Sequence, residues 1–391
     1  MGEVSVQRKK ELAVYIAAFT GPLAGNAVLA LVGTLSVEWS VTRTAVLISI
    51  PAFMVPFALI QLFSGTVAEA YERRTTVTVG LLVYIAGSLA CGAVNSLAPF
   101  LLARVVQGVG YAFVNPVLVA VLSDVAGGSR QGTAMGFYGS WTSAGVASGP
   151  FLAGALAEIS WRLAFVAIAV LAFVVLVLIN MVLERSDTPK TKTPVRAALR
   201  QLASVAADRD IALLSGSGFL AFFAFGGVIS FVSVYLASPA LDLDASEIGV
   251  AISLSGLVGI FASPVAGRSV DKIGPRCCVS VGFLVTAGMA IALSQAQSYA
   301  HFLVLLPIMG AGTGFIWSSL LTMLMRVGPS IKATSSSVFN SSRFTGYAVS
   351  PILLTPLYDM AGFGVVVVTC GVLGLVALGL ALSSRRSLDK R

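Results

Sequence analysis

Long apolar blocks follow one another along this chain and are separated by short polar connections. A helix that crosses a lipid bilayer needs about 20 mostly apolar residues, and twelve of the blocks reach that length. The blocks are residues 12–36, 44–66, 75–95, 98–122, 133–157, 163–183, 211–237, 246–270, 277–296, 300–326, 333–358 and 361–383. Barrel strands would alternate in polarity over about ten residues, whereas these blocks are continuous. The pattern therefore predicts an all-α integral membrane protein with twelve transmembrane helices.

The longest polar segment, residues 184–210, separates the first six blocks from the last six. Its first part is rich in proline, threonine and lysine. Its second part places Val195, Leu199, Leu202 and Val205 along one side, as in a helix that lies on a membrane surface. Three parts are expected: an N-terminal six-helix bundle, a cytoplasmic linker with a surface helix, and a C-terminal six-helix bundle. Their bounds are 1–183, 184–210 and 211–391.

Composition and charge agree with a membrane protein. Apolar residues make up 57% of the chain and charged residues 11%, which excludes an ordinary soluble protein of this length. Most lysines and arginines fall on the side of the membrane that holds both termini, and the opposite connections contain only Arg43 and Arg162. The positive-inside rule then places both termini in the cytoplasm and the protein in the cytoplasmic (plasma or cell inner) membrane. The net charge of +8 is therefore a membrane-orientation signal, and we expect lipid rather than nucleic acid as a partner.

Side chains that could carry enzyme chemistry are sparse. The chain has one histidine, His301, and four cysteines, Cys91, Cys277, Cys278 and Cys370, without metal-ligand spacing. The basic start MGEVSVQRKK leads into an apolar block too long for a signal peptide, so it is expected to remain as the first helix. We expect no metal, no cofactor and no enzymatic activity.

The two halves repeat each other in sequence. GTVAEAYERR aligns with GRSVDKIGPR, SAGVASGP with FTGYAVSP, and GVG with GAG, always in the same order and 201 or 202 residues apart. These pairs begin at residues 65 and 267, 143 and 344, and 108 and 310. Parallel repeats of this kind occur in transporters whose halves rock about a central site. On these features the chain resembles the major facilitator superfamily, which implies two pseudo-symmetric six-helix bundles and secondary active transport by alternating access.

The fifth block carries a glycine-rich motif, GFYGSWTSAGVASGPFLAG. It resembles the antiporter motif of the twelve-helix drug:proton antiporters, with one closing glycine replaced by alanine. The motif residues are Gly136, Gly145, Gly149, Pro150 and Gly154. Small residues allow a neighbouring helix to approach closely, and the proline removes a backbone donor. This resemblance implies export, with the fifth helix tightly packed at the interface between halves.

The loop after the second block and its copy resemble the signature loop of the superfamily. We expect Glu69 to meet the start of helix eleven, and Asp271 to meet the start of helix five near Arg130, where helix dipoles hold carboxylates. Such contacts would close the cytoplasmic side. Glu69, Asp124 and Asp271 are also the cytoplasmic carboxylates that could titrate. The residues expected to form the gating loops are Gly65, Glu69, Arg73, Arg74, Asp124, Arg130, Gly267, Asp271, Gly274 and Arg276.

Two arginines lie inside apolar blocks. Arg104 is about 9–10 Å below the external end of its helix and must face a cavity or a buried partner, unless it extends to the interface. Arg104 and Gln107 resemble the fourth-helix motif R-x2-Q-G-x-G, which implies a role in proton coupling and substrate-linked rearrangement. The second half has Leu306 and Met309 at the matching positions, so the helix can be built without the charge.

Arg343 lies near the membrane midplane in the polar stretch NSSRFTG, beside Asn340. Its counterpart in the first half is Thr142. Arg343 is expected either to face the cavity, with a role in binding or coupling, or to pack on a carbonyl or an aromatic ring. Asn26 and Asn115 are further polar candidates for the site.

Two functions are compatible with these residues. The resemblance favours proton-coupled efflux (antiport) of a small amphipathic molecule. However, the apolar blocks contain no carboxylate in their central parts, and buried arginines attract anions. The alternative is a transporter of an organic anion or acidic lipid whose coupling ion is unknown. In both cases the partners are a small-molecule substrate and the bilayer, with a proton as coupling ion in the first, and we expect a monomer.

Overall fold

The computed structural model describes residues 2–63, 72–126, 131–184, 195–327 and 332–384, and helix is the only regular secondary structure within them. The apolar blocks fold as helices because a backbone in a bilayer must satisfy its own hydrogen bonds. In chain order the helices are α1 (Gly2–Glu38), α2 (Arg43–Val46), α3 (Ser49–Leu62), α5 (Arg73–Ala93), α6 (Leu97–Ala126), α7 (Gln131–Ala157), α8 (Arg162–Val182), α9 (Val195–Ala206), α10 (Arg209–Leu236), α11 (Ala245–Ile273), α12 (Pro275–Leu293), α13 (Tyr299–Val327) and α14 (Lys332–Ser383).

These helices form twelve membrane-spanning segments. Ten helices in the described ranges are long and apolar enough to cross a membrane, with α2 and α3 together forming one span. The 52-residue α14 counts once among the ten but contains two spans, because Gly362 has a φ of +76° and breaks its helical path. Glycine adopts this conformation without the strain of a Cβ. The twelfth span is α7, whose glycines, serines and threonines lower its hydropathy. The predicted twelve-helix fold is confirmed.

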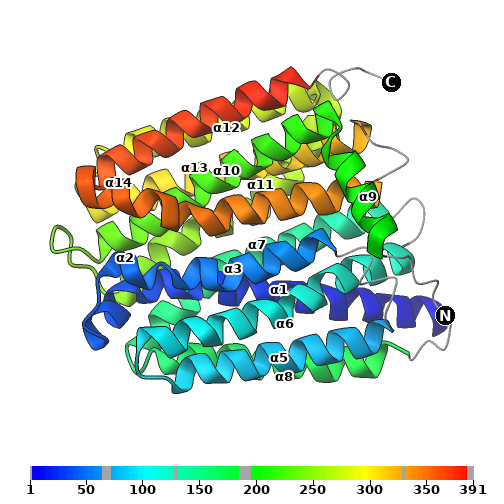
Figure 1. The fold of residues 1–391 in the computed structure, drawn as a ribbon, viewed down its shortest axis with the longest axis horizontal. Helices are drawn as coiled ribbons and strands as arrows, with labels where there is room; N and C mark the ends of the chain where they lie inside the picture. Colours follow the sequence, from blue (N-terminus) through cyan, green and yellow to red (C-terminus); the bar gives the residue numbers. More distant parts are fainter. Residues whose placement is uncertain (1, 64–71, 127–130, 185–194, 328–331, 385–391) are drawn as a thin grey trace.

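Figure 1 shows two groups of helices lying side by side, one with α1, α3, α5, α6 and α8 and the other with α10, α12, α13 and α14. The start of α1, the end of α14 and the crossing helix α9 lie at the same end of the molecule. We call this the cytoplasmic end, as the charge pattern predicts, and the opposite end external. The predicted surface helix corresponds to α9, where Val205 is buried against the second group.

Local backbone geometry repeats between the two groups with an offset of 202 residues. Ser40 and Asp242, both before the second helix of their half, have positive φ angles of 53° and 50°. Two residues later, Thr42 and Asp244 each cap the following helix through a side-chain oxygen. The same backbone path was therefore built twice, as the sequence repeat predicts.

Close helix contacts repeat in the same way. A Cβ added to Gly108 would lie 2.2 Å from the carbonyl oxygen of Phe53, and one added to Gly310 would lie 2.0 Å from that of Ser255. Each glycine thus lets the fourth helix of its half press against the second. These equivalent contacts establish two pseudo-symmetric six-helix bundles.

The outer surface is apolar, as a bilayer requires. Large apolar side chains are exposed on the outward helices, including Leu102 on α6 and Val170, Phe173 and Met181 on α8, which are 57–77% exposed. A surface of this kind in water would be a large hydrophobic patch, whereas lipid tails cover it at no cost.

Candidate functional site

The two bundles meet along α7 and α11, which run antiparallel. A Cβ added to Gly154 would lie 2.3 Å from the carbonyl oxygen of Ala245, and one added to Gly249 would lie 2.5 Å from that of Pro150. Closer to the midplane, a Cβ on Gly256 would lie 2.7 Å from the backbone nitrogen of Ala147. Small residues therefore bring these two helices into backbone contact from the external end to the centre.

The same two helices separate toward the cytoplasmic end. Gly136 and Gly267 lie eleven residues beyond Ala147 and Gly256, which is about three helical turns, so they lie on the same helix faces. A Cβ added to either one would have no atom within 4 Å. Along this pair of helices the molecule is therefore closed externally and open on the cytoplasmic side.

Hydrogen bonds between the bundles occur near the centre. The Tyr347 hydroxyl donates to Asn26 Oδ1 at 2.8 Å, and both residues are buried. Ser341 Oγ donates to the carbonyl oxygen of Ala58 at 2.9 Å. Asn26, predicted as a polar candidate, is thus part of the contact between halves.

Arg343 lies in this central region on α14, surrounded by aromatic rings. The carbon of its guanidinium is 3.8 Å from the ring centroid of Trp317, 4.2 Å from that of Phe344 and 4.5 Å from that of Phe222. A cation over aromatic faces is stabilised by about 0.5–2 kcal/mol. We call these three rings the aromatic box. The aromatic contacts match one of the two predicted environments of Arg343, and its role in binding or coupling stays a prediction.

The polar atoms around Arg343 are only partly used. Its Nε is buried and has no hydrogen-bond acceptor within the described chain. Asn340 Oδ1, one turn earlier on α14, is also buried and has no hydrogen-bond donor there. In the first bundle, the Tyr138 hydroxyl donates to Asn115 Oδ1 at 2.5 Å. A buried unpaired polar atom costs about 1–3 kcal/mol. This site can therefore gain free energy from a ligand that supplies hydrogen-bond acceptors to Arg343.

Arg104 has a different environment, because its donors are used inside the first bundle. It is 0% exposed and donates to the carbonyl oxygens of Ala24 at 2.9 Å and Ser49 at 3.2 Å, and to Gln107 Oε1 at 2.6 Å. Gln107 in turn donates to Ser88 Oγ at 2.8 Å. Arg104 neither extends to the interface nor faces an open site; in this conformation it ties α1, α3 and α6 together.

The antiporter-motif residues divide between two neighbours. A Cβ added to Gly145 would lie 2.3 Å from the carbonyl oxygen of Phe19, and one added to Gly149 would lie 2.4 Å from that of Leu23. Both oxygens belong to α1 of the same bundle. Gly154 and Pro150 contact α11 of the opposite bundle. The motif thus packs α7 between α1 and α11.

The first gating loop can be described only in part, because Gly65, Glu69 and Arg130 lie outside the described residues. Arg73 and Asp124 form an ion pair at 2.5 Å, and Arg74 Nε donates to Asn180 Oδ1 at 2.9 Å. These contacts join α5 to α6 and α8 within one bundle. Glu72, where the signature loop has glycine, caps α5 by accepting from the backbone nitrogens of Arg74 and Thr75.

The second gating loop is a tight turn. Gly274 has a φ of +85° and ends α11, and Pro275 begins α12. Glycine suits the positive φ, and proline at the first helical position loses no helical hydrogen bond. Asp271 and Arg276 are exposed, and no described residue forms an ion pair with Asp271. The expected contact of Asp271 with helix five stays a prediction.

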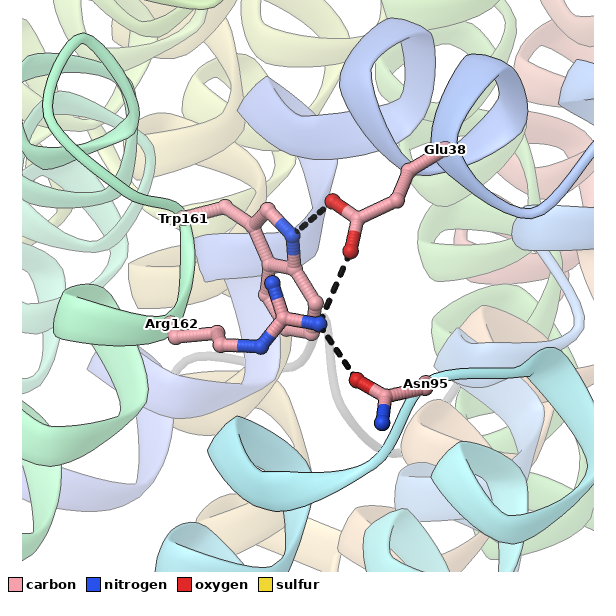
Figure 2. Close-up of polar contacts among 4 residues, drawn as sticks. All are labelled: Glu38, Asn95, Trp161 and Arg162. Atoms are coloured by element: carbon pink, nitrogen blue, oxygen red, sulfur yellow. Dashed lines mark hydrogen bonds and ion pairs between the residues drawn. The ribbon is translucent and has the colours of Figure 1, made fainter.

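Sequence analysis missed a polar cluster at the external end (Figure 2). Arg162 donates to Glu38 at 2.8 Å and to Asn95 at 2.7 Å, and Trp161 Nε1 also donates to Glu38. The cluster joins three external connections of the first bundle. The sequence did single out Arg162 as one of only two arginines in the external connections. Its partners could not be predicted, because Glu38 and Asn95 are far from Arg162 in sequence.

Two carboxylates are more buried than the sequence indicates. Glu11 on α1 is 8% exposed and Asp210 at the start of α10 is 5% exposed. Both lie toward the cytoplasmic ends of their helices. Across the described residues, the central parts of the spans contain no Asp or Glu.

Comparison with known proteins identifies the family. The family model described as Major Facilitator Superfamily matches residues 14–351 and, in a second match, residues 214–390. The chain belongs to the Major Facilitator Superfamily. Its members are multi-pass membrane transporters that bind small molecules within the membrane. The second match covers the C-terminal bundle, in agreement with the internal repeat.

Individual members of this superfamily resemble the chain along most of its length. The multidrug efflux protein YfmO of Bacillus subtilis is 23% identical, over 86% of this chain and 83% of that protein. The probable L-galactonate transporter of Escherichia coli is 24% identical, over 85% of this chain and 78% of that protein. The human organic anion transporter MFSD10 has the same fold, with a TM-score of 0.76, 19% identity, and coverage of 96% of this chain and 99% of that one.

Proposed function

We propose that this protein transports a small amphipathic organic anion across the cytoplasmic membrane by alternating access, and that Arg343 binds the anionic group. The observation that carries the proposal is the unpartnered Nε of Arg343. Arg343 contacts Phe344, whose ring centroid is 4.8 Å from that of Phe57 in the first bundle. Charged groups inside a membrane span are costly and are retained for function. Both termini lie in the cytoplasm in this proposal.

The chemistry of the site favours an anion over a cation. A carboxylate or phosphate can accept two parallel hydrogen bonds from a guanidinium, which a cationic drug cannot. A cation would also find no acidic counter-charge, because the described carboxylates lie at the ends of the spans. Asn340 Oδ1 can accept a hydrogen bond from a hydroxyl or amide of the same ligand.

Proton-coupled efflux is the second candidate. The similarity to YfmO and the antiporter-like motif around Gly149 and Pro150 support it. Glu11 and Asp210 are buried carboxylates that could carry the proton, together with the cytoplasmic Asp124. An organic anion exported in exchange for protons combines both candidates.

Counterflow in proteoliposomes tests the proposal. Vesicles loaded with a panel of unlabelled organic acids should accumulate the labelled form of the one that is transported, and Arg343→Gln should abolish this accumulation. Arg268→Gln is the matched control, because it makes the same change at an exposed position near the cytoplasmic end of α11. Unchanged accumulation by Arg343→Gln would refute the binding role of Arg343.

A further inference from the structure

The C-terminal bundle contains an apolar cavity. Its volume is about 30 Å³, and it lies among α10, α12, α13 and the last helix of α14. Phe222 and Phe225 line it from α10, Ala287 from α12, and Ile316 from α13. We call it the tail cavity.

The tail cavity and Arg343 share Phe222 as a neighbour. Phe222 lines the cavity, and its ring centroid is 4.5 Å from the guanidinium carbon of Arg343. On α13, Ile316 lines the cavity and the next residue, Trp317, contacts Arg343. The two sites are therefore adjacent, and the Phe222 side chain contacts both.

The two threonine hydroxyls in the cavity wall have no spare donors. Thr286 and Thr313 line the cavity, but their hydroxyls donate to the carbonyl oxygens of Gly282 and Met309 on their own helices, at 3.0 Å in both cases. Ordered water needs two to four polar partners, so a small apolar cavity without them suits an apolar group better than water.

We propose that the tail cavity receives the apolar tail of an amphipathic anion whose charged head binds Arg343, and that the Phe222 ring turns aside to admit it. This inference rests on the proposed function and narrows its substrate class to organic acids with an alkyl tail. Turning the ring moves aside a side chain that contacts both the cavity and the guanidinium, so that one ligand reaches both.

The test is the chain-length dependence of binding. Dissociation constants of acetate, butyrate, hexanoate and octanoate are measured by calorimetry on the full chain in lipid nanodiscs, with empty nanodiscs as the blank. Each methylene that enters an apolar site should strengthen binding by about fourfold until the cavity is full. Ala287→Phe, which fills the cavity from α12, should keep the affinity for acetate and lose the gain with chain length.

The matched control is Gly288→Phe, which adds the same side chain one residue away, at an exposed position with no atom within 4 Å of an added Cβ. Its chain-length dependence should equal that of the unmodified protein. If Ala287→Phe does not fold, Ala287→Leu makes a smaller change in the same direction.

The outcomes separate this inference from the proposed function. Binding of all four acids that requires Arg343 but does not strengthen with chain length would overturn the tail cavity alone. Retention of the fourfold gain by Ala287→Phe or Ala287→Leu would also overturn it. Length-dependent binding that survives Arg343→Gln would support the cavity and refute the anion site. Absence of binding by every acid would refute both.

Discussion

Arg104 and Gln107 offer a quantitative test of how the first bundle holds a buried charge. The second bundle shows which substitutions to make, because buried Leu306 and Met309 occupy the positions that match Arg104 and Gln107. We therefore consider Arg104→Leu, Gln107→Met and the double variant as a thermodynamic cycle.

The magnitude follows from the hydrogen bonds. Arg104→Leu leaves Gln107 Oε1 buried without its donor at 2.6 Å, and Gln107→Met leaves an Arg104 N–H without its acceptor. Each orphaned group costs about 1–3 kcal/mol. The double variant removes both partners, so it should be less destabilising than the sum of the single variants by about 1.5–3 kcal/mol, the contribution of one charge-assisted hydrogen bond.

Steric-trap unfolding in bicelles measures these differences in the free energy of unfolding. A control cycle pairs Arg104→Leu with Ser342→Ala, because Ser342 donates to the Ser215 carbonyl oxygen in the other bundle and shares no partner with Arg104. The control cycle should be additive within about 0.5 kcal/mol. If the changes in the free energy of unfolding of Arg104→Leu and Gln107→Met also add within about 0.5 kcal/mol, the buried hydrogen bond between Arg104 and Gln107 is refuted.

Three further predictions concern the contacts between bundles. Gly154→Val places a side chain against the α11 backbone and should open the external side, so that membrane-impermeant maleimide labels a central cysteine faster from outside. Tyr347→Phe removes the hydrogen bond to Asn26, worth about 0.5–1.5 kcal/mol, and should raise the same labelling rate by about two- to tenfold. The two cysteines of a Gly136→Cys/Gly267→Cys variant should form a disulfide under mild oxidation when the cytoplasmic ends of α7 and α11 approach each other. The fraction cross-linked should be higher when Gly154→Val is also present.

Each of these has a result that would contradict it. Unchanged external labelling of Gly154→Val would show that α7 and α11 can separate without loss of closure. Slower labelling of Tyr347→Phe would mean that the hydrogen bond stabilises the outward-open state. Cross-linking that never exceeds the level of a single-cysteine control would refute the helix register.

The fold could be predicted from the sequence because each element depends on local composition. Continuous apolar blocks define spans, and the repeat at an offset of 202 residues predicts two equivalent bundles. The break between α2 and α3 was not predictable, since it depends on a single turn, whereas the two spans of α14 correspond to the two predicted blocks 333–358 and 361–383. Helices such as α6 also continue past their apolar blocks, because charged side chains at the membrane surface do not end a helix.

The site could be predicted only to the level of residue types. Depth in the membrane required that Arg104 and Arg343 have special environments, but their partners come from other helices. Arg104 reaches carbonyl oxygens of α1 and α3, where Gly108 allows the helices to approach within backbone contact. Arg343 meets Phe222 and Trp317, which are more than twenty residues away in sequence and became neighbours only through packing.

The most direct test of the central claim is ligand-dependent thermal stabilisation of the purified protein, with organic anions and lipophilic cations as the two panels. A ligand at 100 times its dissociation constant stabilises the folded state by about 2.7 kcal/mol. We expect that an organic anion raises the melting temperature, that Arg343→Gln abolishes the increase, and that the Arg104→Leu/Gln107→Met double variant retains it. Stabilisation by cations alone, unaffected by Arg343→Gln, would contradict this expectation.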